Sequence, residues 1–139
     1  CYETALMDVK PGSVILLTDL NDFKVVNDTY GHSVGDLCLI RTSEIMRRIY
    51  GRYGQCFRIG GDEYAVLLTR HTKDIKQLND DFFTVVEQMV KEDPRMTGIS
   101  LGYAYVNTSG ENIAGVVNHA DQELYRSKQK RPHVNRHQV

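Results

Sequence analysis

No run of apolar residues in this 139-residue chain approaches the roughly 18 needed to cross a lipid bilayer. The first residues also lack the basic start and short apolar stretch of a signal peptide. We therefore expect a cytoplasmic domain without direct membrane contact, although a parent protein could still be anchored in a membrane.

Cysteine is scarce and scattered. The three cysteines, Cys1, Cys38 and Cys56, include no pair at CxxC spacing. An odd, widely spaced set forms neither a disulfide framework nor a zinc site. We expect free thiols in a reducing compartment.

The chain also lacks an excess of either charge. Its 17 Lys and Arg residues against 18 Asp and Glu residues give a formal net charge of −1. Binding of nucleic acid needs a dominant basic face, so nucleic acid is not an expected partner. With 41% hydrophobic and 25% charged residues and no internal repeat, the chain is typical of one soluble globular domain with its own core.

The spacing of apolar residues predicts an α+β fold. Two apolar segments, 55–59 and 64–69, flank a tight turn and predict a β-hairpin, which argues against a purely parallel sheet. The sequence favours a mainly antiparallel sheet with helices packed on its faces. The other expected strands cover 14–19 and 97–106, and the expected helices cover 1–10, 22–30, 35–50, 74–91 and 113–124.

The hairpin turn carries an unusual tetrapeptide, Gly60-Gly61-Asp62-Glu63. Its glycines give access to positive φ and remove side chains, so that a ligand can approach the main chain. Two consecutive carboxylates at the tip project in different directions. For the tetrapeptide alone, a solvated turn remains the simpler interpretation.

Asp19 ends the first buried strand, where an unpaired carboxylate would be costly. It either caps the next helix or binds a metal ion. Magnesium takes one or two protein carboxylates and completes its shell with water and phosphate oxygens. Asp19 with Asp62 or Glu63 supplies such a pair if the strand end and the turn meet in space.

Four segments in fixed order closely resemble the GGDEF family of diguanylate cyclases. Tyr64 replaces the usual Phe at the end of the motif. The likeness covers residues 1–132, with the usual opening segment ahead of Cys1 missing, and leaves 133–139 as an expected disordered tail. The four segments are 19–36, 58–64, 100–104 and 120–128.

The resemblance implies a ferredoxin-like, palm-type sheet of the kind found in nucleotidyl cyclases. It also implies condensation of two GTP molecules into cyclic di-GMP with release of two pyrophosphates. Mg²⁺ is the implied cofactor, with Mn²⁺ as a substitute. Each domain would hold one GTP, so the active species would be a homodimer, fused to sensory or other signalling domains in the full protein.

Site residues follow from the resemblance position by position. Asp62 and Glu63 are the implied catalytic residues, and the implied metal ligands are Asp19, the main-chain carbonyl of Leu20, Asp62 and Glu63. A carboxylate such as Asp36 accepts from guanine N1–H and its exocyclic amine together, which adenine cannot offer. The implied substrate-binding residues are Phe23, Lys24, Asn27, Asp36, Gly60, Gly61 and Lys128, with both lysines on phosphate.

Three departures from the family pattern matter. Asn21 stands where many members have a second Asp. Gly51 and Gly54 replace the Arg-x-x-Asp pair of the inhibitory site, so no product inhibition through that site is expected. The segment 128–132 lacks the usual Gly-Arg after its lysine, which affects triphosphate binding. The alternatives are a degenerate module that binds GTP or cyclic di-GMP without catalysis, and a structural dimerisation module.

Overall fold

The computed structural model describes residues 1–70, 74–107 and 112–130. The expected tail over 133–139 lies outside these ranges, as do positions 131 and 132. The elements follow one another as α1 (Tyr2–Met7), β1 (Val14–Leu20), α2 (Phe23–Tyr30), α3 (His32–Tyr50), β2 (Gly54–Arg58), β3 (Glu63–Leu68), α4 (Ile75–Glu92), β4 (Ile99–Tyr105) and α5 (Ile113–Lys130).

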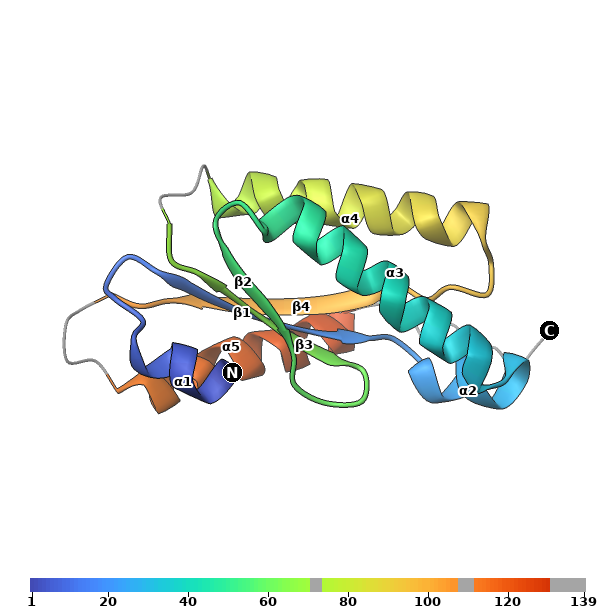
Figure 1. Ribbon diagram of the computed structural model, residues 1–139, viewed down its shortest axis with the longest axis horizontal. Coiled ribbons are helices and arrows are strands. Elements are labelled where there is room, and N and C mark those ends of the chain that lie inside the picture. The colour runs from blue at the N-terminus through green and yellow to red at the C-terminus, as the bar shows by residue number, and fades with distance from the viewer. Residues whose placement is uncertain (71–73, 108–111, 131–139) are drawn as a thin grey trace.

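The four strands form one antiparallel sheet in the order β2-β3-β1-β4. The central strand β1 pairs with β3 on one side and β4 on the other, and the hairpin places β2 at an edge. Helices α3 and α4 cover one face of the sheet, and α1 and α5 cover the other (Figure 1). The α+β, ferredoxin-like architecture expected from the sequence is confirmed.

Alternation along β1 divides the core into two layers. Val14, Leu16 and Leu20 pack under α3 and α4, whereas Ile15 and Leu17 pack against α1 and α5. Successive strand side chains point to opposite faces, and every residue of β1 is buried. The next odd position, Asp19, therefore projects on the face covered by α5.

The start of α3 differs from the expected one. The helix begins at His32, three positions earlier than residue 35, because Gly31 alone separates it from α2 by adopting φ 89°. Gly31 is the N-cap of α3, so Asp36 does not cap this helix. Asp36 instead lies within the helix, one turn from its start.

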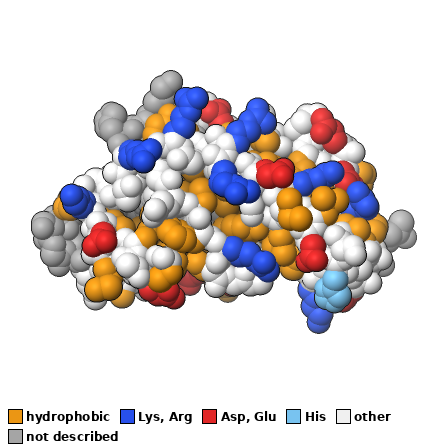
Figure 2. Space-filling view, in the orientation of Figure 1, with side chains coloured by type: hydrophobic (Ala, Val, Ile, Leu, Met, Phe, Trp, Pro, Cys, Tyr) orange, Lys and Arg blue, Asp and Glu red, His pale blue; other side chains and the backbone are white. Residues whose placement is uncertain are grey.

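The three cysteines are free thiols, as expected. Within the described residues, no helix has the length and apolar character of a membrane span. On the face shown in Figure 2, lysine and arginine side chains are scattered among acidic and hydrophobic ones.

Candidate active site

The register of the two central strands brings two of the expected site carboxylates together. Asp19 on β1 lies directly opposite Glu63 on β3. Directly opposite residues of an antiparallel pair project from the same face, with Cβ atoms about 5 Å apart. The strand end and the motif therefore do meet, as the sequence hypothesis required.

A cavity of about 400 Å³ opens beside this carboxylate pair. We call it the acidic cavity, because Asp19, Glu63 and Asp121 line it together with Lys128. Its volume is within the range of roughly 300–1,000 Å³ typical of small-molecule sites. Its other lining residues are Tyr2, Leu17, Thr18, Ile59, Tyr64, Ala114, Val117, Asn118 and Leu124.

Lys128 supplies a positive charge to the acidic cavity. Its Nζ contacts Oδ2 of Asp19. The Asp19 side chain is 9% exposed and the Lys128 side chain 41% exposed. A carboxylate this buried needs a cationic partner to offset its lost hydration, and α5 delivers one.

The donor set fits a magnesium ion that shares its shell with a substrate. Asp19 and Glu63 supply two carboxylates on one cavity, the number that Mg²⁺ typically takes from a protein. Across the described ranges, no three His, Cys, Asp or Glu side chains converge as a metal cluster. Main-chain carbonyls, water and phosphate oxygens would have to complete the shell, as they do for Mg²⁺.

Asp62 meets the end of β1 through its main chain. Its carbonyl accepts a hydrogen bond from the Leu20 amide at 3.1 Å. Its side chain is half-buried and does not line the acidic cavity. Of the two motif carboxylates, the structure therefore places Glu63 beside Asp19.

The β2–β3 turn, residues 59–62, is closed without positive φ angles. Among the described glycines only Gly12 and Gly31 adopt positive φ, so the turn does not use the access to positive φ that Gly60 and Gly61 provide. A Cβ on Gly60 would lie 3.3 Å from Glu63, whereas one on Gly61 would meet nothing within 4 Å. The second expected role is supported: at Gly61 the main chain is open to an approaching group.

Arg58 holds this turn in place. Its guanidinium donates to the carbonyl of Gly60 at 3.2 Å and to that of Gly61 at 2.9 Å. The turn also closes through the Ile59 amide, which donates to the Glu63 carbonyl at 2.9 Å. No role was predicted for Arg58, although it lies in the motif segment 58–64.

The expected guanine-binding residues lie on α2 and α3, at the end of the sheet where β1 leads into α2. Asn27 is half-buried and Asp36 is exposed. A Cβ on the buried Gly35 would lie 1.9 Å from Oδ1 of Asn27, so the Asn27 side chain rests directly on this glycine. Gly35 thus positions Asn27, a role that was not predicted from the sequence. The only hint in the sequence is that Gly35 directly precedes the motif residue Asp36.

The remaining expected substrate contacts are spread around that end of the sheet. Lys24 is exposed on α2, and Phe23 is half-buried against the core under α3 and α4. The described residues that line the acidic cavity do not include Phe23, Lys24, Asn27 or Asp36. The structure therefore divides the expected site residues into two groups, one at the acidic cavity and one on α2 and α3.

Tyr64, the departure at the end of the motif, ties β3 to α3. Its side chain is 2% exposed. Its hydroxyl lies 2.8 Å from the Leu39 carbonyl, to which it donates, and accepts from Ser43 Oγ at 3.1 Å. The extra oxygen relative to Phe is therefore satisfied within the core.

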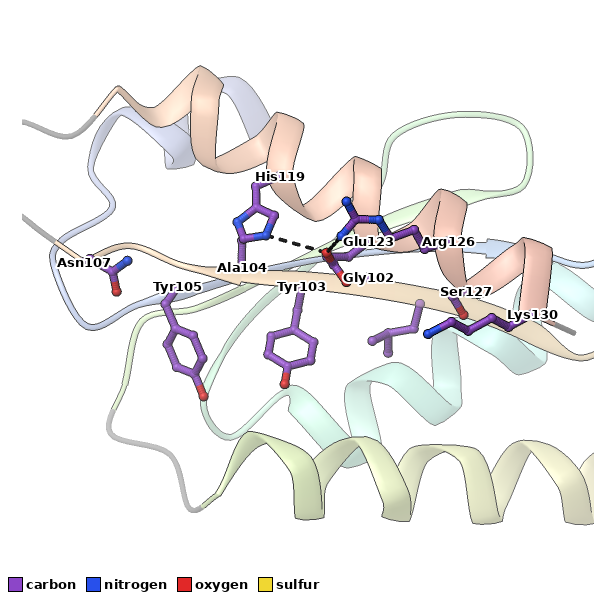
Figure 3. A pocket seen from close by; sticks show the side chains of 11 residues that line it. Gly102, Tyr103, Ala104, Tyr105, Asn107, His119, Glu123, Arg126, Ser127 and Lys130 are labelled. Atoms are coloured by element: carbon purple, nitrogen blue, oxygen red, sulfur yellow. Dashed lines mark hydrogen bonds and ion pairs between the residues drawn. The ribbon is translucent and has the colours of Figure 1, made fainter.

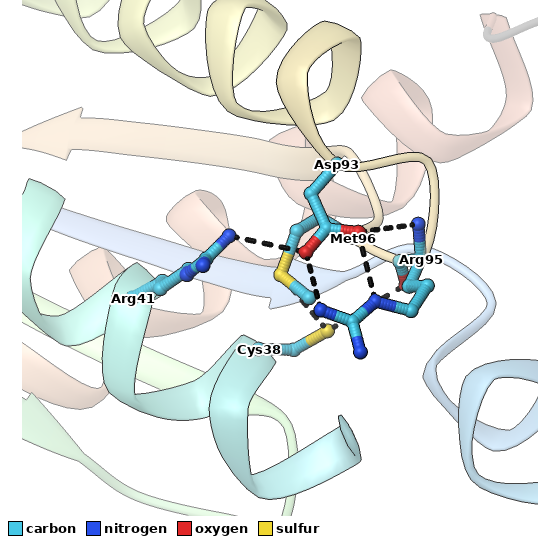
Figure 4. Close-up of polar contacts among 5 residues, drawn as sticks. All are labelled: Cys38, Arg41, Asp93, Arg95 and Met96. Atoms are coloured by element: carbon cyan, nitrogen blue, oxygen red, sulfur yellow. Dashed lines mark hydrogen bonds and ion pairs between the residues drawn. The ribbon is translucent and has the colours of Figure 1, made fainter. Parts of the chain in front are cut away.

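The segment between α4 and β4 is clamped onto α3 by an ionic cluster (Figure 4). The Asp93 carboxylate accepts from Arg95 at 2.8 and 2.9 Å and from Arg41 at 3.3 Å. Hydrogen bonding from Arg95 lowers the pKa of Asp93 to about 2. Beneath this cluster Cys38 Sγ contacts Met96 Sδ at 3.5 Å.

The same segment also holds Asn21, which follows the expected metal-binding positions. The Asn21 amide donates to the Gly98 carbonyl at 2.8 Å, and Ser100 Oγ donates to Asn21 Oδ1 at 2.6 Å. The residues from Asp93 to Ser100 thus connect the turn after β1 to α3. No sequence pattern pointed to this link.

A larger hollow of about 590 Å³ runs along the outer edge of β4 (Figure 3). Beside it, the Glu123 carboxylate accepts from Arg126 at 2.6 Å and pairs with His119 at 3.7 Å. None of the expected catalytic, metal-binding or substrate-binding residues lines this hollow. The acidic cavity, which contains both Asp19 and Glu63, is therefore the better candidate site despite its smaller volume.

The chain is similar to known proteins over most of its length. Residues 3–133 match the family described as diguanylate cyclase, GGDEF domain. The chain is 31% identical over 119 residues to Diguanylate cyclase A of Treponema denticola, which covers 83% of this chain and 32% of that protein. The chain spans about a third of the length of such curated relatives.

Two solved structures share the fold. An EAL/GGDEF domain protein from M. capsulatus superposes with a TM-score of 0.77 at 28% identity, over 92% of this chain and 87% of that one. The GGDEF domain of DgcB from Caulobacter crescentus, in complex with c-di-GMP, gives a TM-score of 0.73 at 26% identity, over 84% of this chain and 72% of that one.

Proposed function

Because the chain belongs to the GGDEF domain family of diguanylate cyclases, we propose that it condenses two GTP molecules into cyclic di-GMP in a magnesium-dependent reaction. The observation that carries the proposal is the pairing of Asp19 with Glu63 across the central strands, beside a cavity that also receives Lys128. Two carboxylates and an ammonium in one cavity suit a metal–triphosphate complex.

Each of the two groups of site residues has a defined task in this reaction. Asp36 and Asn27 hold the guanine edge, and Lys24 and Lys128 contact phosphate oxygens. A bound Mg²⁺ would neutralise charge that develops on the α-phosphate and lower the pKa of the attacking hydroxyl. Asp19, the Leu20 carbonyl and Asp62 or Glu63 would be its protein ligands, with Mn²⁺ as a plausible substitute.

The chemical step is an in-line displacement that occurs twice. The 3′-oxygen of one GTP bonds to the α-phosphorus of the other, and the bond from that phosphorus to the bridging oxygen of the leaving pyrophosphate breaks. Glu63, exposed at the end of the turn, accepts the 3′-hydroxyl proton. Two such steps close the ring and release two pyrophosphates.

The domain has one set of the expected guanine-binding and phosphate-binding residues, so each copy would hold one GTP and two copies must face each other during the reaction. We propose a homodimer as the active species and a parent protein in which further signalling domains control its assembly. The use of GTP would place this domain in the cytoplasm. The Gly51 and Gly54 positions give no arginine or carboxylate for product inhibition.

The test is release of pyrophosphate from GTP and Mg²⁺, with chromatographic detection of cyclic di-GMP. The wild-type chain is compared with Asp62→Ala and Glu63→Ala, and with Glu87→Ala as an exposed carboxylate control on α4. We expect the two motif variants to lose about 100-fold or more in rate and the control to lose nothing.

The other outcomes separate the alternatives. Binding of GTP or cyclic di-GMP by the wild-type chain without pyrophosphate release, even with forced dimers, would indicate a regulatory binding module. A calorimetric titration that detects no guanine nucleotide binding would contradict both functions and favour a structural dimerisation module.

A further inference from the structure

The ion pair between Lys128 and Asp19 joins an exposed, flexible side chain to a buried one on the central strand. Asp19 is fixed in the central strand and its side chain is 9% exposed. Lys128 extends from the last turn of α5 on a flexible four-carbon stem, and 41% of its side chain faces solvent. If another cation reaches Asp19, the lysine can leave and the aspartate cannot.

The position of α5 is set independently of this ion pair. A Cβ on Gly102 of β4 would lie 2.1 Å from the Leu124 amide nitrogen and 2.3 Å from the Ala120 carbonyl oxygen. The helix therefore packs directly on the main chain of β4, one turn before Lys128. Because the fold fixes the base of this side chain, its charged end can exchange partners without movement of the helix.

We propose that Lys128 is the resident counter-ion of Asp19, that a divalent cation displaces it, and that the released ammonium then binds the phosphates of the incoming nucleotide. This inference rests on the proposed function, because it assigns the metal to Asp19. Two cations beside the same carboxylate repel each other, so the lysine and the metal compete for Asp19. Neutral replacement of the lysine would remove that competition.

The exchange has a consequence that a simple phosphate-binding lysine would not produce. Without nucleotide, competition from Lys128 weakens metal binding by about tenfold, the size expected for one charge-assisted hydrogen bond. With nucleotide present, the displaced lysine gains phosphate as a new partner. Metal and nucleotide therefore strengthen each other's binding, and the effect is reciprocal.

The experiment is a titration of the nucleotide-free full chain with Mn²⁺, with the free ion measured by electron paramagnetic resonance. Lys128→Met keeps the apolar stem and removes the charge, Lys128→Arg keeps the charge, and Lys130→Met is a neighbouring control that lines the other hollow. We expect the Mn²⁺ affinity of Lys128→Met to rise about tenfold, and those of Lys128→Arg and Lys130→Met to stay within about threefold of wild type. An unchanged or lower affinity in Lys128→Met would overturn the proposal.

A second measurement serves if Lys128→Met does not fold. In the wild-type chain with ¹³C-labelled lysine, the Lys128 Cε resonance should shift when Mg²⁺ is added without nucleotide, and a resonance that does not move would refute the exchange.

The two proposals can fail separately. If the chain makes no cyclic di-GMP but Lys128→Met binds Mn²⁺ more tightly, the proposed exchange stands and the proposed catalytic function is wrong. If the chain makes cyclic di-GMP but metal causes no change at Lys128, the proposed function stands and the proposed exchange is wrong.

Discussion

Replacement of Gly35 by alanine should weaken nucleotide binding without loss of stability. The new Cβ would lie 1.9 Å from Oδ1 of Asn27, closer than real Cβ atoms approach other atoms, and 3.0 Å from Cγ of the same side chain. The obstructing group is the end of a side chain, so Asn27 rotates away while α3 keeps its place. The substitution therefore acts as a remote removal of the Asn27 side chain.

The two effects of Gly35→Ala have opposite signs. Alanine in place of glycine inside a helix adds up to about 1 kcal/mol to the free energy of unfolding. Loss of one hydrogen bond from Asn27 to guanine costs about 0.5–1.5 kcal/mol of binding free energy, which raises KM for GTP roughly 2- to 13-fold. We expect a melting temperature equal to or above that of wild type together with weaker GTP use.

Steady-state kinetics with GTP and a thermal melt check this prediction. Gly115→Ala is the matched control, because a Cβ at this exposed position on α5 would meet nothing within 4 Å. It should alter neither KM nor kcat. In an Asn27→Ala background Gly35→Ala should have no further effect on KM. An unchanged KM in the single variant, or an equal loss in the Asn27→Ala background, would refute the reasoning.

Three further predictions concern stability. Tyr64→Phe removes a buried hydroxyl that hydrogen bonds to α3 and should lower the free energy of unfolding in urea by about 1 kcal/mol while activity persists. Gly54→Asp would place a Cβ 1.8 Å from the Leu67 carbonyl oxygen, so this variant should lose more than about 2 kcal/mol in the same assay and gain no product inhibition; normal stability would contradict the close strand pairing. Asp93, with its pKa held near 2 by Arg95, should stabilise the fold above about pH 4 and lose this effect as the pH falls towards 2, so the stability gap to Asp93→Asn in urea should close over that range.

Much of the fold was predictable because the information is local. Strict alternation over 99–105 and helical spacing over 75–92 each reflect which side of the element meets the core, and both elements form as expected. The start of α3 was misplaced because one glycine, Gly31, both ends α2 and caps α3 with φ 89°, and no apolar period marks such a break.

The candidate site was predictable only in part. The motifs identified Asp19 and Glu63, but their closeness depends on the β1–β3 register, a pairing between residues 44 positions apart (63 minus 19). Two further features depend on side-chain contacts that no spacing rule encodes. They are the packing of Asn27 against Gly35 and the hydrogen bond between Asn21 and Ser100. Gly60 and Gly61 allow positive φ, but the turn closes without it, which the sequence could not show.

The sequence by itself determined the order of helices and strands, the hairpin with its carboxylates, and the family likeness, because each is carried by neighbouring residues. Only the tertiary structure decided that Asp19 lies in one cavity with Glu63 and forms an ion pair with Lys128, 109 positions away (128 minus 19). Strand register and helix docking arise from the packing of the whole core, so they bring together groups whose distance along the chain says nothing of their distance in space.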